Sequence, residues 1–497
     1  MLTFHFLNFG CRASQADGAS LKKQLLDAGL REVERAEHSR VAVLNTCTVT
    51  ADADAEVRQV IRRIHRANPQ CRILVTGCYA QRAPEEIACL EGVAWVVGNS
   101  HKHTVAKVLS ASGMGMPSLR SGQALPMSPH GRDARATPLV QISGSSPEGV
   151  GGQSETEVAV GEISEEFHFA PVFPDDRTRP TLKVQDGCNA RCSFCIIPAV
   201  RGASRSLAPD TVIEQVHELE RGGFKEIVLS GINLGGYGRD LERRITFLGL
   251  LERILEESHI ARIRISSIEP MDVSPALIRL VAQEPRMAQH FHIPLQSGCD
   301  RILRLMNRRY WARQYAERIS AIREQIPNCG IGADVMDGFP GETDEDHASS
   351  VRFIESLPLT YVHVFPYSAR PMTAAASEPD QVNGRVARDR GWEIRHLVAA
   401  KHRAFLAAQV GRTLSAVTLG ERNDGARMAL TTNYLKAALP GSSAGQNVLL
   451  EVAVGRADDN LLYGYAPESL STPTPDLASN QASQPASGLA YLCDGQN

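Results

Sequence analysis

The sequence predicts an α/β protein with a small parallel α/β domain at its N-terminus, a larger parallel barrel or partial barrel, and a small antiparallel β-barrel at its C-terminus. Strand-type apolar runs alternate with helix-type stretches over residues 1–110 and again over residues 167–408. Such alternation is typical of parallel sheets whose helices cover their faces. From residue 409 to residue 467, short apolar runs alternate with turn residues instead, which favours a small barrel.

In the N-terminal part, three cysteines each follow a strand-type run. Cys11, Cys47 and Cys78 end such runs and precede helix-compatible stretches. The carboxyl ends of parallel strands lie on one edge of a sheet, so we expect these thiols to meet although they are far apart in sequence. They are candidate ligands of an iron-sulfur cluster with one open iron. The alternative is that they are ordinary buried cysteines, as we expect for Cys71 and Cys89.

The middle part repeats strand and helix units. The expected helices are 209–221, 246–257, 275–282 and 313–325, and the expected strands are 226–230, 262–266, 291–294, 332–336 and 361–365. Repeated units of this kind predict a parallel barrel or part of one, with the active site at the carboxyl ends of its strands.

A third group of cysteines has a spacing that indicates specific chemistry. Cys188, Cys192 and Cys195 are separated by three and two residues, within a loop-like segment. Three thiolates can hold three irons of a [4Fe-4S] cube and leave the fourth open to a small molecule. Structural zinc would require four ligands, and no His or Cys follows at finger spacing. The loop context disfavours three merely buried thiols.

These cysteines, with Phe194 before the last, resemble the signature of radical S-adenosylmethionine (SAM) enzymes. The two halves together resemble the methylthiotransferases over roughly residues 1–110 and 167–466. The phrases that carry the resemblance are 45–50, 76–81, 185–188, 230–235, 266–270, 292–298 and 338–343. The first five resemble the branch that acts on threonylcarbamoyladenosine in tRNA, and the last two complete the set.

The resemblance implies a six-unit partial barrel open on one side, two [4Fe-4S] clusters and SAM. It also implies a C-terminal RNA-binding domain of the TRAM type. The expected cofactor-binding residues at the barrel mouth are Phe194, Ser230, Gly231, Ser267, Glu269, Gln296, Gly338 and Gly341. Asp337, beside that last turn, stands where the family usually has an apolar residue.

The implied activity adds a methylthio group to C2 of N6-threonylcarbamoyladenosine next to the anticodon. One SAM would methylate a sulfur at the N-terminal cluster, and another would yield the radical that activates C2. The implied partners are tRNA, a sulfur donor and a low-potential electron donor of the flavodoxin or ferredoxin type. Alternative substrates are isopentenyladenosine in tRNA and an aspartate of a ribosomal protein. Outside the class, the chain could be a non-catalytic two-cluster electron carrier.

Composition adds limits. The 497 residues include eleven cysteines, no apolar run of membrane-spanning length and no signal-peptide pattern, so we expect a cytoplasmic protein. The net charge of −3 excludes bulk attraction to nucleic acid, so RNA binding must use local patches. Candidate patches are Arg58, Arg62, Arg63 and Arg66 on one helix face, and Arg304, Arg308 and Arg309.

Two segments break the pattern. Residues 111–166 contain no aromatic residue and are rich in Gly, Ser and Pro, which favours a disordered insert. Residues 468–497 have a similar composition and predict a disordered tail. The predicted domain boundaries are therefore 1–110, 111–166, 167–408, 409–467 and 468–497.

Overall fold

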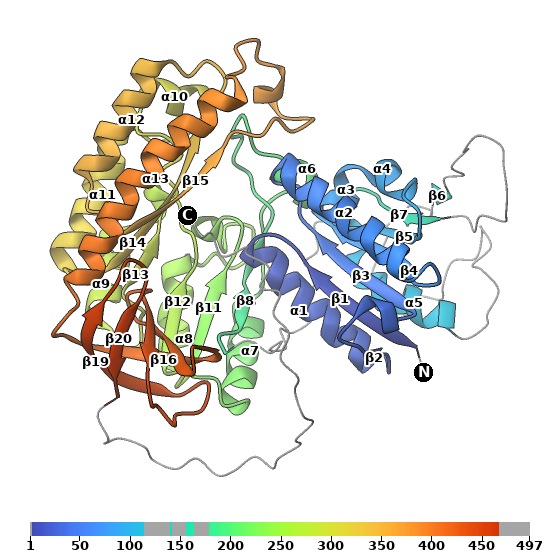
Figure 1. Cartoon of the computed structure of the whole chain (residues 1–497), viewed down its shortest axis with the longest axis horizontal. Coiled ribbons are helices and arrows are strands. Elements are labelled where there is room, and N and C mark those ends of the chain that lie inside the picture. Colours follow the sequence, from blue (N-terminus) through green and yellow to red (C-terminus); the bar gives the residue numbers. More distant parts are fainter. Residues whose placement is uncertain (1, 114–139, 142–155, 164–177, 467–497) are drawn as a thin grey trace.

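The computed structural model describes residues 2–113, 140–141, 156–163 and 178–466. Figure 1 shows three bodies: an N-terminal α/β domain, a larger core and a small barrel that packs beneath the core. The predicted fold class is confirmed. No helix among the described residues is long and apolar enough to cross a membrane. The residues of the predicted tail lie outside the described part of the chain, and the predicted domain boundaries stay predictions.

The N-terminal domain is a sheet in the order β2-β1-β3-β4-β5-β7-β6. Its elements are β1 (Thr3–Asn8), α1 (Arg12–Asp27), β2 (Arg31–Glu32), β3 (Val41–Thr46), α2 (Ala51–Ala67), β4 (Arg72–Gly77), α3 (Cys78–Arg82), α4 (Pro84–Ala88), β5 (Val93–Gly98), α5 (Val105–Gly113), β6 (Val140–Gln141) and β7 (Glu157–Ala159). Residues from α2, α3 and α4 fill the core on one face of the sheet, and residues from α1 and α5 fill the other. Strands β1, β3 and β4 are adjacent and parallel.

Part of the segment that composition marked as a disordered insert belongs to this sheet. Strand β7 pairs in parallel with β5, and its Val158 and Ala159 are buried. Two apolar residues, Val158 and Ala159, are enough to form a short strand at the edge of a sheet. The polar residues around them make this short strand hard to predict from composition. Most of the remaining segment lies outside the described residues.

The core contains six parallel strands. β8 (Thr181–Lys183), β11 (Glu226–Ser230) and β12 (Arg262–Ile265) form one sheet, and β13 (His290–His292), β14 (Gly330–Asp337) and β15 (Tyr361–Pro366) form another. Two parallel bridges, Ile263 to Met287 and Ser267 to His292, join the sheets into one curved wall. The helices are α6 (Ile197–Arg201), α7 (Pro209–Arg221), α8 (Phe247–Glu257), α9 (Pro275–Gln283), α10 (Asp300–Leu305), α11 (Ala312–Gln325), α12 (Asp344–Ser356) and α13 (Gly384–Ala407). This is the partial barrel that the sequence resemblance implied.

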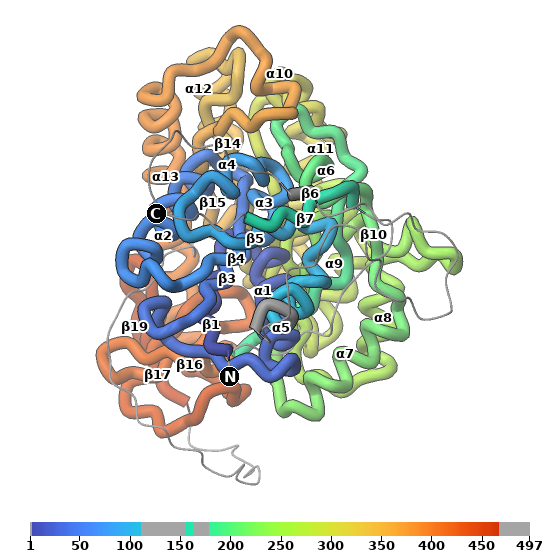
Figure 2. Tube along the Cα trace, turned by 90° about the vertical axis from the view of Figure 1, so that its right-hand side faces the viewer, coloured from blue at the N-terminus to red at the C-terminus, as the bar shows by residue number. Residues whose placement is uncertain are grey.

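The N-terminal domain lies beside the core (Figures 1 and 2), and ion pairs join it to both ends of this wall. Near β8, Asp17 of α1 forms an ion pair with Lys183. Beyond β15, Asp54 of α2 pairs with Arg370, and the Ala51 backbone N–H donates to Ser368 Oγ at 2.9 Å. The domain therefore spans the gap between the first and last strands of the partial barrel.

The C-terminal body is a closed five-stranded barrel in the order β16-β17-β18-β20-β19. Its strands are β16 (Thr413–Asn423), β17 (Ala426–Thr431), β18 (Lys436–Leu439), β19 (Leu449–Ala457) and β20 (Leu462–Tyr465). Four of the pairings are antiparallel, but β18 and β20 pair in parallel. The expectation of an antiparallel barrel is corrected at this seam, because β20 returns beside β18 only after β19 has crossed the barrel.

A buried carboxylate organises the attachment of this barrel to the core. Glu226 of β11 is fully buried, and Arg264 Nε of β12 donates to it at 2.7 Å. The same guanidinium donates to the backbone carbonyls of Thr431 and Thr432 in the small barrel. Burial alone would raise the pKa of Glu226, but the guanidinium groups of Arg264 and Arg179 lower it to about 2.

We predict that Glu226→Gln lowers stability towards urea at pH 7, because it removes the charge that holds buried guanidinium groups. Breaking such a pair typically costs roughly 3–5 kcal/mol. The pKa of Glu226 is depressed in the folded state, so its contribution is complete above about pH 4.3 and is lost as the pH falls towards about 2. The variant should therefore differ from the parent at pH 7 and converge with it in acid. Exposed Glu214→Gln on α7 is the control, and an equal effect of both variants would contradict the assignment.

Candidate functional site

The structure brings the three N-terminal cysteines together. Cys11 follows β1 at the start of α1, Cys47 directly follows β3, and Cys78 begins α3 directly after β4. The loops touch closely: a Cβ on Gly10 would lie 2.4 Å from Cys47 Cβ, and Gly10 has a φ of 96°. A glycine is needed there because only glycine tolerates both the backbone angle and the close approach. The predicted convergence of the thiols at one sheet edge is therefore what the fold shows.

The environment of these thiols fits a bound metal cluster. Burial first, and then the negative charges of Cys11 and Cys78, raise the pKa of Cys47 to about 12. Three thiolates held together in this way need a compensating cation, which a ligated metal provides. Around them, Asn99 Nδ2 donates to Cys78 Sγ at 3.4 Å, and the charge of Arg201 is close enough to favour thiolate at Cys47.

The second triad lies in the loop after the short strand β9 (Gln185–Asp186), at the carboxyl end of β8. The Ala190 backbone N–H donates to Cys188 Sγ at 3.3 Å, and Arg308 Nη1 donates to Cys192 Sγ at 3.2 Å. Burial raises the pKa of Cys195 to about 12. These donors would stabilise cluster-bound thiolates, so this triad also fits a four-iron cluster with one open iron.

Arg308 corrects one expectation from the sequence. Its basic neighbours indicated an RNA-binding patch with Arg304 and Arg309, yet the Arg308 side chain is only 6 % exposed. It pairs with Glu269 and contacts Cys192, so it belongs to the cluster site. The sequence cannot separate the two cases, because a group of arginines has the same pattern whether one side chain is buried or all are exposed to solvent.

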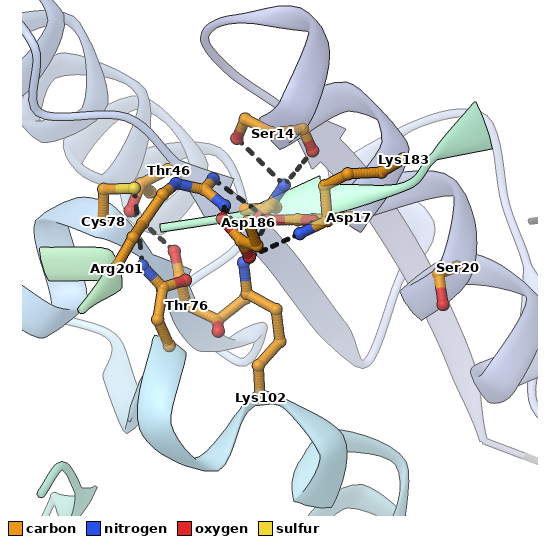
Figure 3. A network of polar contacts seen from close by, with 12 residues as sticks. Ser14, Asp17, Ser20, Thr46, Thr76, Cys78, Lys102, Lys183, Asp186 and Arg201 are labelled. Carbon is orange, nitrogen blue, oxygen red and sulfur yellow. Dashed lines mark hydrogen bonds and ion pairs between the residues drawn. The ribbon is translucent and has the colours of Figure 1, made fainter. Parts of the chain in front are cut away.

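A buried ionic network joins the N-terminal domain to the core beside Cys78 (Figure 3). Asp17 of α1 accepts from Lys183 at 2.6 Å, from Arg201 at 3.0 Å and from Lys102 at 3.0 Å. Asp186, two residues before Cys188, accepts from Lys183 at 2.6 Å and from Arg201 at 3.0 Å. Sequence reasoning missed this network, because its members come from four separate segments and carry no motif.

Apolar packing joins the same two loops. Cys78 packs with Ile196 and Val200, and Ile196 directly follows Cys195. Asn99, the donor to Cys78, also donates to the Val200 carbonyl at 2.8 Å. The segment that follows Cys195 thus packs directly against Cys78 of the first triad.

The expected cofactor-binding residues differ in their burial and in their contacts. Phe194 packs edge-on against Phe339, with ring centroids 6.4 Å apart. Ser230 is buried at the end of β11, and a Cβ on Gly231 would lie 2.9 Å from Gln185 Oε1, so Gly231 keeps that approach open. Their contacts with cofactor stay predictions.

The other barrel-end residues differ in orientation. Ser267 is exposed, whereas Glu269 is held by Arg308. Burial raises the pKa of Glu269 against the opposing effect of Arg308. Gln296 has a φ of 65°, and its buried Oε1 has no hydrogen-bond partner among the described residues. This oxygen is therefore a candidate acceptor for a bound cofactor.

The Gly338 to Gly341 turn packs partly against helix α13. A Cβ on Gly338 would lie 2.5 Å from Ala387 Cβ, whereas a Cβ on Gly341 would meet only Leu305 at 3.7 Å. The adjacent Asp337 does not point to solvent: it is 1 % exposed, and neither carboxyl oxygen has a partner among the described residues. Burial, and then the charge of Glu342, raise its pKa to about 7.

A partial parallel barrel with a Cys-x3-Cys-x2-Cys loop at its mouth defines a radical SAM enzyme. Residues 182–354 match the model of the Radical SAM superfamily, and residues 3–98 match that of the Uncharacterized protein family UPF0004. A solved structure of a radical SAM methyltransferase from Kitasatospora setae, TsrM, has a TM-score of 0.50 at 14 % identity over 76 % of this chain and 75 % of that one. That likeness concerns the fold alone.

Curated relatives define the family more narrowly. The chain is 35 % identical to "Threonylcarbamoyladenosine tRNA methylthiotransferase MtaB" of Aquifex aeolicus, over 86 % of this chain and 95 % of the relative. The protein of the same name from Bacillus subtilis is 36 % identical, over 78 % and 79 %. A "tRNA-2-methylthio-N(6)-dimethylallyladenosine synthase" of Pelotomaculum thermopropionicum is 31 % identical, over 86 % and 88 %. The chain belongs to the radical SAM methylthiotransferases, enzymes that use two [4Fe-4S] clusters and SAM.

We predict that Asp337→Asn stabilises the protein above pH 7. The folded-state pKa of Asp337 is raised to about 7 by burial, so its stability contribution is complete below about pH 3.9 and falls as the pH rises to about 7. The loss amounts to roughly 1.4 kcal/mol per pH unit over that window. The gain in urea midpoint over the parent should therefore be larger at pH 8 than at pH 5.

Asp389→Asn, at an exposed position of α13, serves as the control and should change little at either pH. If Asp337→Asn gave the same shift at pH 5 and pH 8, the buried carboxyl would not be the titrating group.

Proposed function

We propose that this enzyme adds a methylthio group to C2 of N6-threonylcarbamoyladenosine next to the anticodon of tRNA. The observation that carries the substrate assignment is the match to relatives that bear that name over most of both chains. The two adjacent thiol triads support the reaction type, because a methylthio transfer to an inert carbon needs both a sulfur carrier and a radical source in reach of one substrate.

Each residue set has a separate task in this proposal. Cys188, Cys192 and Cys195 would hold one cluster, and Cys11, Cys47 and Cys78 would hold the other. When bound there, the clusters and SAM would supply one-electron chemistry and the methyl group, and a separate donor would supply the sulfur. The N-terminal domain contacts both ends of the barrel wall, through Asp17 with Lys183 and through Asp54 with Arg370.

The protein's own charges then act on the two sites. Arg201 lies between the triads and offsets the negative charge that three thiolates bring to the N-terminal site. Arg308 does the same beside Cys192 and also orients Glu269 at the barrel mouth. These side chains need not transfer a proton, because abstraction of hydrogen from C2 is not acid-base chemistry.

The RNA would contact several bodies. Arg62, Arg63 and Arg66 lie exposed on α2, and the closed C-terminal barrel is consistent with the TRAM domain that the resemblance implied. A sulfur donor and a low-potential electron donor, of the flavodoxin or ferredoxin type, complete the reaction. A cytoplasmic location follows from a tRNA substrate.

Two alternatives are separable by experiment. Isopentenyladenosine in tRNA is favoured by the Pelotomaculum relative, while an aspartate of a ribosomal protein would require a protein-binding mouth. A non-catalytic electron carrier is disfavoured because the curated relatives over most of the chain bear the names of tRNA-modifying enzymes.

We predict that Cys47→Ala separates the two half-reactions. The reconstituted variant should still cleave SAM to 5'-deoxyadenosine, because the second triad is intact, but should form no methylthiolated nucleoside. Its iron content should fall to about half that of the parent, since one of two four-iron sites is lost. Mass spectrometry of a threonylcarbamoylated anticodon stem-loop measures the product.

Cys71→Ala is the matched control, because Cys71 is a buried thiol of the same domain outside the triad. Product formation by Cys47→Ala at the parent rate would refute the role of the N-terminal triad. The substrate assignment would be refuted if the parent enzyme modified an isopentenylated stem-loop but not a threonylcarbamoylated one.

A further inference from the structure

The barrel wall holds a compact group of ionisable side chains that neither triad uses. His292 of β13, Asp334 of β14 and His363 of β15 come from three adjacent strands, and one potential ligand atom from each lies within 4.8 Å of the others. His292 Nε2 is 3.0 Å from Asp334 Oδ2, and Asp334 pairs directly with His363 in the strand register. We call these three residues the His/Asp cluster.

A hydrogen-bonded relay fixes the orientation of His292. Its Nδ1 lies 3.1 Å from the Tyr361 hydroxyl, which lies 2.7 Å from His290 Nε2. Burial lowers the pKa of His290 well below its ordinary value, so that imidazole is neutral and donates one N–H. One assignment that fits these distances is that His290 donates to Tyr361, Tyr361 donates to His292 Nδ1, and His292 Nε2–H donates to Asp334.

This relay argues against a metal ion in the cluster. In this assignment the single ring lone pair of His292, at Nδ1, accepts from the Tyr361 hydroxyl, so it is not available to a cation. The arrangement instead holds Asp334 as an acceptor. Burial would raise the pKa of Asp334, but the neighbouring His292 and His363 lower it, which keeps the carboxylate ionised.

The cluster is accessible from the lumen. The Asp334 side chain is 25 % exposed, and His363 is half-buried. Imidazole rings stack here, with the centroids of His292 and His363 5.5 Å apart. An ionised acceptor and imidazole groups at a partly open wall form a binding surface for a polar group that carries both donors and acceptors.

The cluster lies between the two cysteine sites. On one side, Ser267 bridges to His292, and the charge of Asp334 acts on Glu269, the partner of Arg308 beside Cys192. On the other side, Tyr361 is near Tyr434 of the small barrel, with ring centroids 5.6 Å apart. Tyr434 in turn accepts from Arg12, the residue after Cys11. A group bound at the cluster would therefore lie between the loops that carry both triads.

We propose that the His/Asp cluster binds the polar substituent on N6 of the substrate purine, an inference that rests on the proposed function. The Asp334 carboxylate accepts hydrogen bonds from the N–H and O–H donors of a threonylcarbamoyl group. The imidazole of His363 donates to its carbonyl or carboxylate oxygens. An isopentenyl group offers no hydrogen bond, so its entry would desolvate Asp334 without replacement, and such a site discriminates strongly against it.

Binding of three fluorescent anticodon stem-loops to the reconstituted full-length enzyme tests this proposal. The loops carry threonylcarbamoyladenosine, isopentenyladenosine or unmodified adenosine at the same position. The parent should bind the threonylcarbamoylated loop at least about tenfold more tightly than the other two, which corresponds to about 1.4 kcal/mol. Asp334→Asn and His363→Phe should each lose most of this preference and bind the unmodified loop as the parent does.

The controls separate a local effect from misfolding. His259→Phe, at an exposed position before β12, should keep the full preference. Iron content and cleavage of SAM identify any variant that fails to fold, and Asp334→Asn keeps the shape of the parent side chain. Preserved preference in both cluster variants would overturn the inference and leave the proposed function intact. A parent enzyme that prefers the isopentenylated loop, or shows no preference, would overturn the proposed function itself.

Discussion

The buried ionic network of Asp17, Lys183, Arg201 and Asp186 is the interaction on which the rest of this structure depends. Ions removed from water lose several kcal/mol each unless every one is paired and hydrogen-bonded. Here Asp17 pairs with Lys102 inside the N-terminal domain and with Lys183 and Arg201 across the domain boundary. Burial opposes ionisation of Asp17, yet Lys102, Lys183 and Arg201 together lower its pKa to about 2. The full set of ion pairs therefore forms only when the two domains are docked.

That docking creates the functional geometry. With α1 fixed against β8, the Cys78 loop packs on α6, and α6 follows directly from the loop of the second triad. The contact of Asp54 with Arg370 at the other end of the barrel wall closes the remaining side. The loops that carry the two triads then pack against each other, and the His/Asp cluster lies on the barrel wall near Glu269. A reaction that joins a sulfur carrier to a radical source requires such proximity.

The sequence predicted those features that periodicity and motif spacing encode. Strand ends located Cys11, Cys47 and Cys78 at one edge, because the parallel sheet dictates where carboxyl ends lie. The network around Arg201 was not predictable, since buried ion pairs between distant segments leave no periodic signal. Arg308 was assigned to an RNA patch because burial of a single arginine depends on tertiary packing. A functional role of His363 was not predicted either, because it lies inside a strand-type run, where a histidine usually only packs against the core.

The central claim is that this chain converts threonylcarbamoyladenosine of tRNA to its 2-methylthio derivative. Mass spectrometry of tRNA nucleosides from cells lacking the chain tests it most directly. The account predicts loss of 2-methylthio-N6-threonylcarbamoyladenosine, accumulation of the unthiolated nucleoside, and recovery with the parent gene but not with a Cys47→Ala gene. Unchanged threonylcarbamoyladenosine derivatives, with loss of the methylthiolated isopentenyl nucleoside instead, would contradict it.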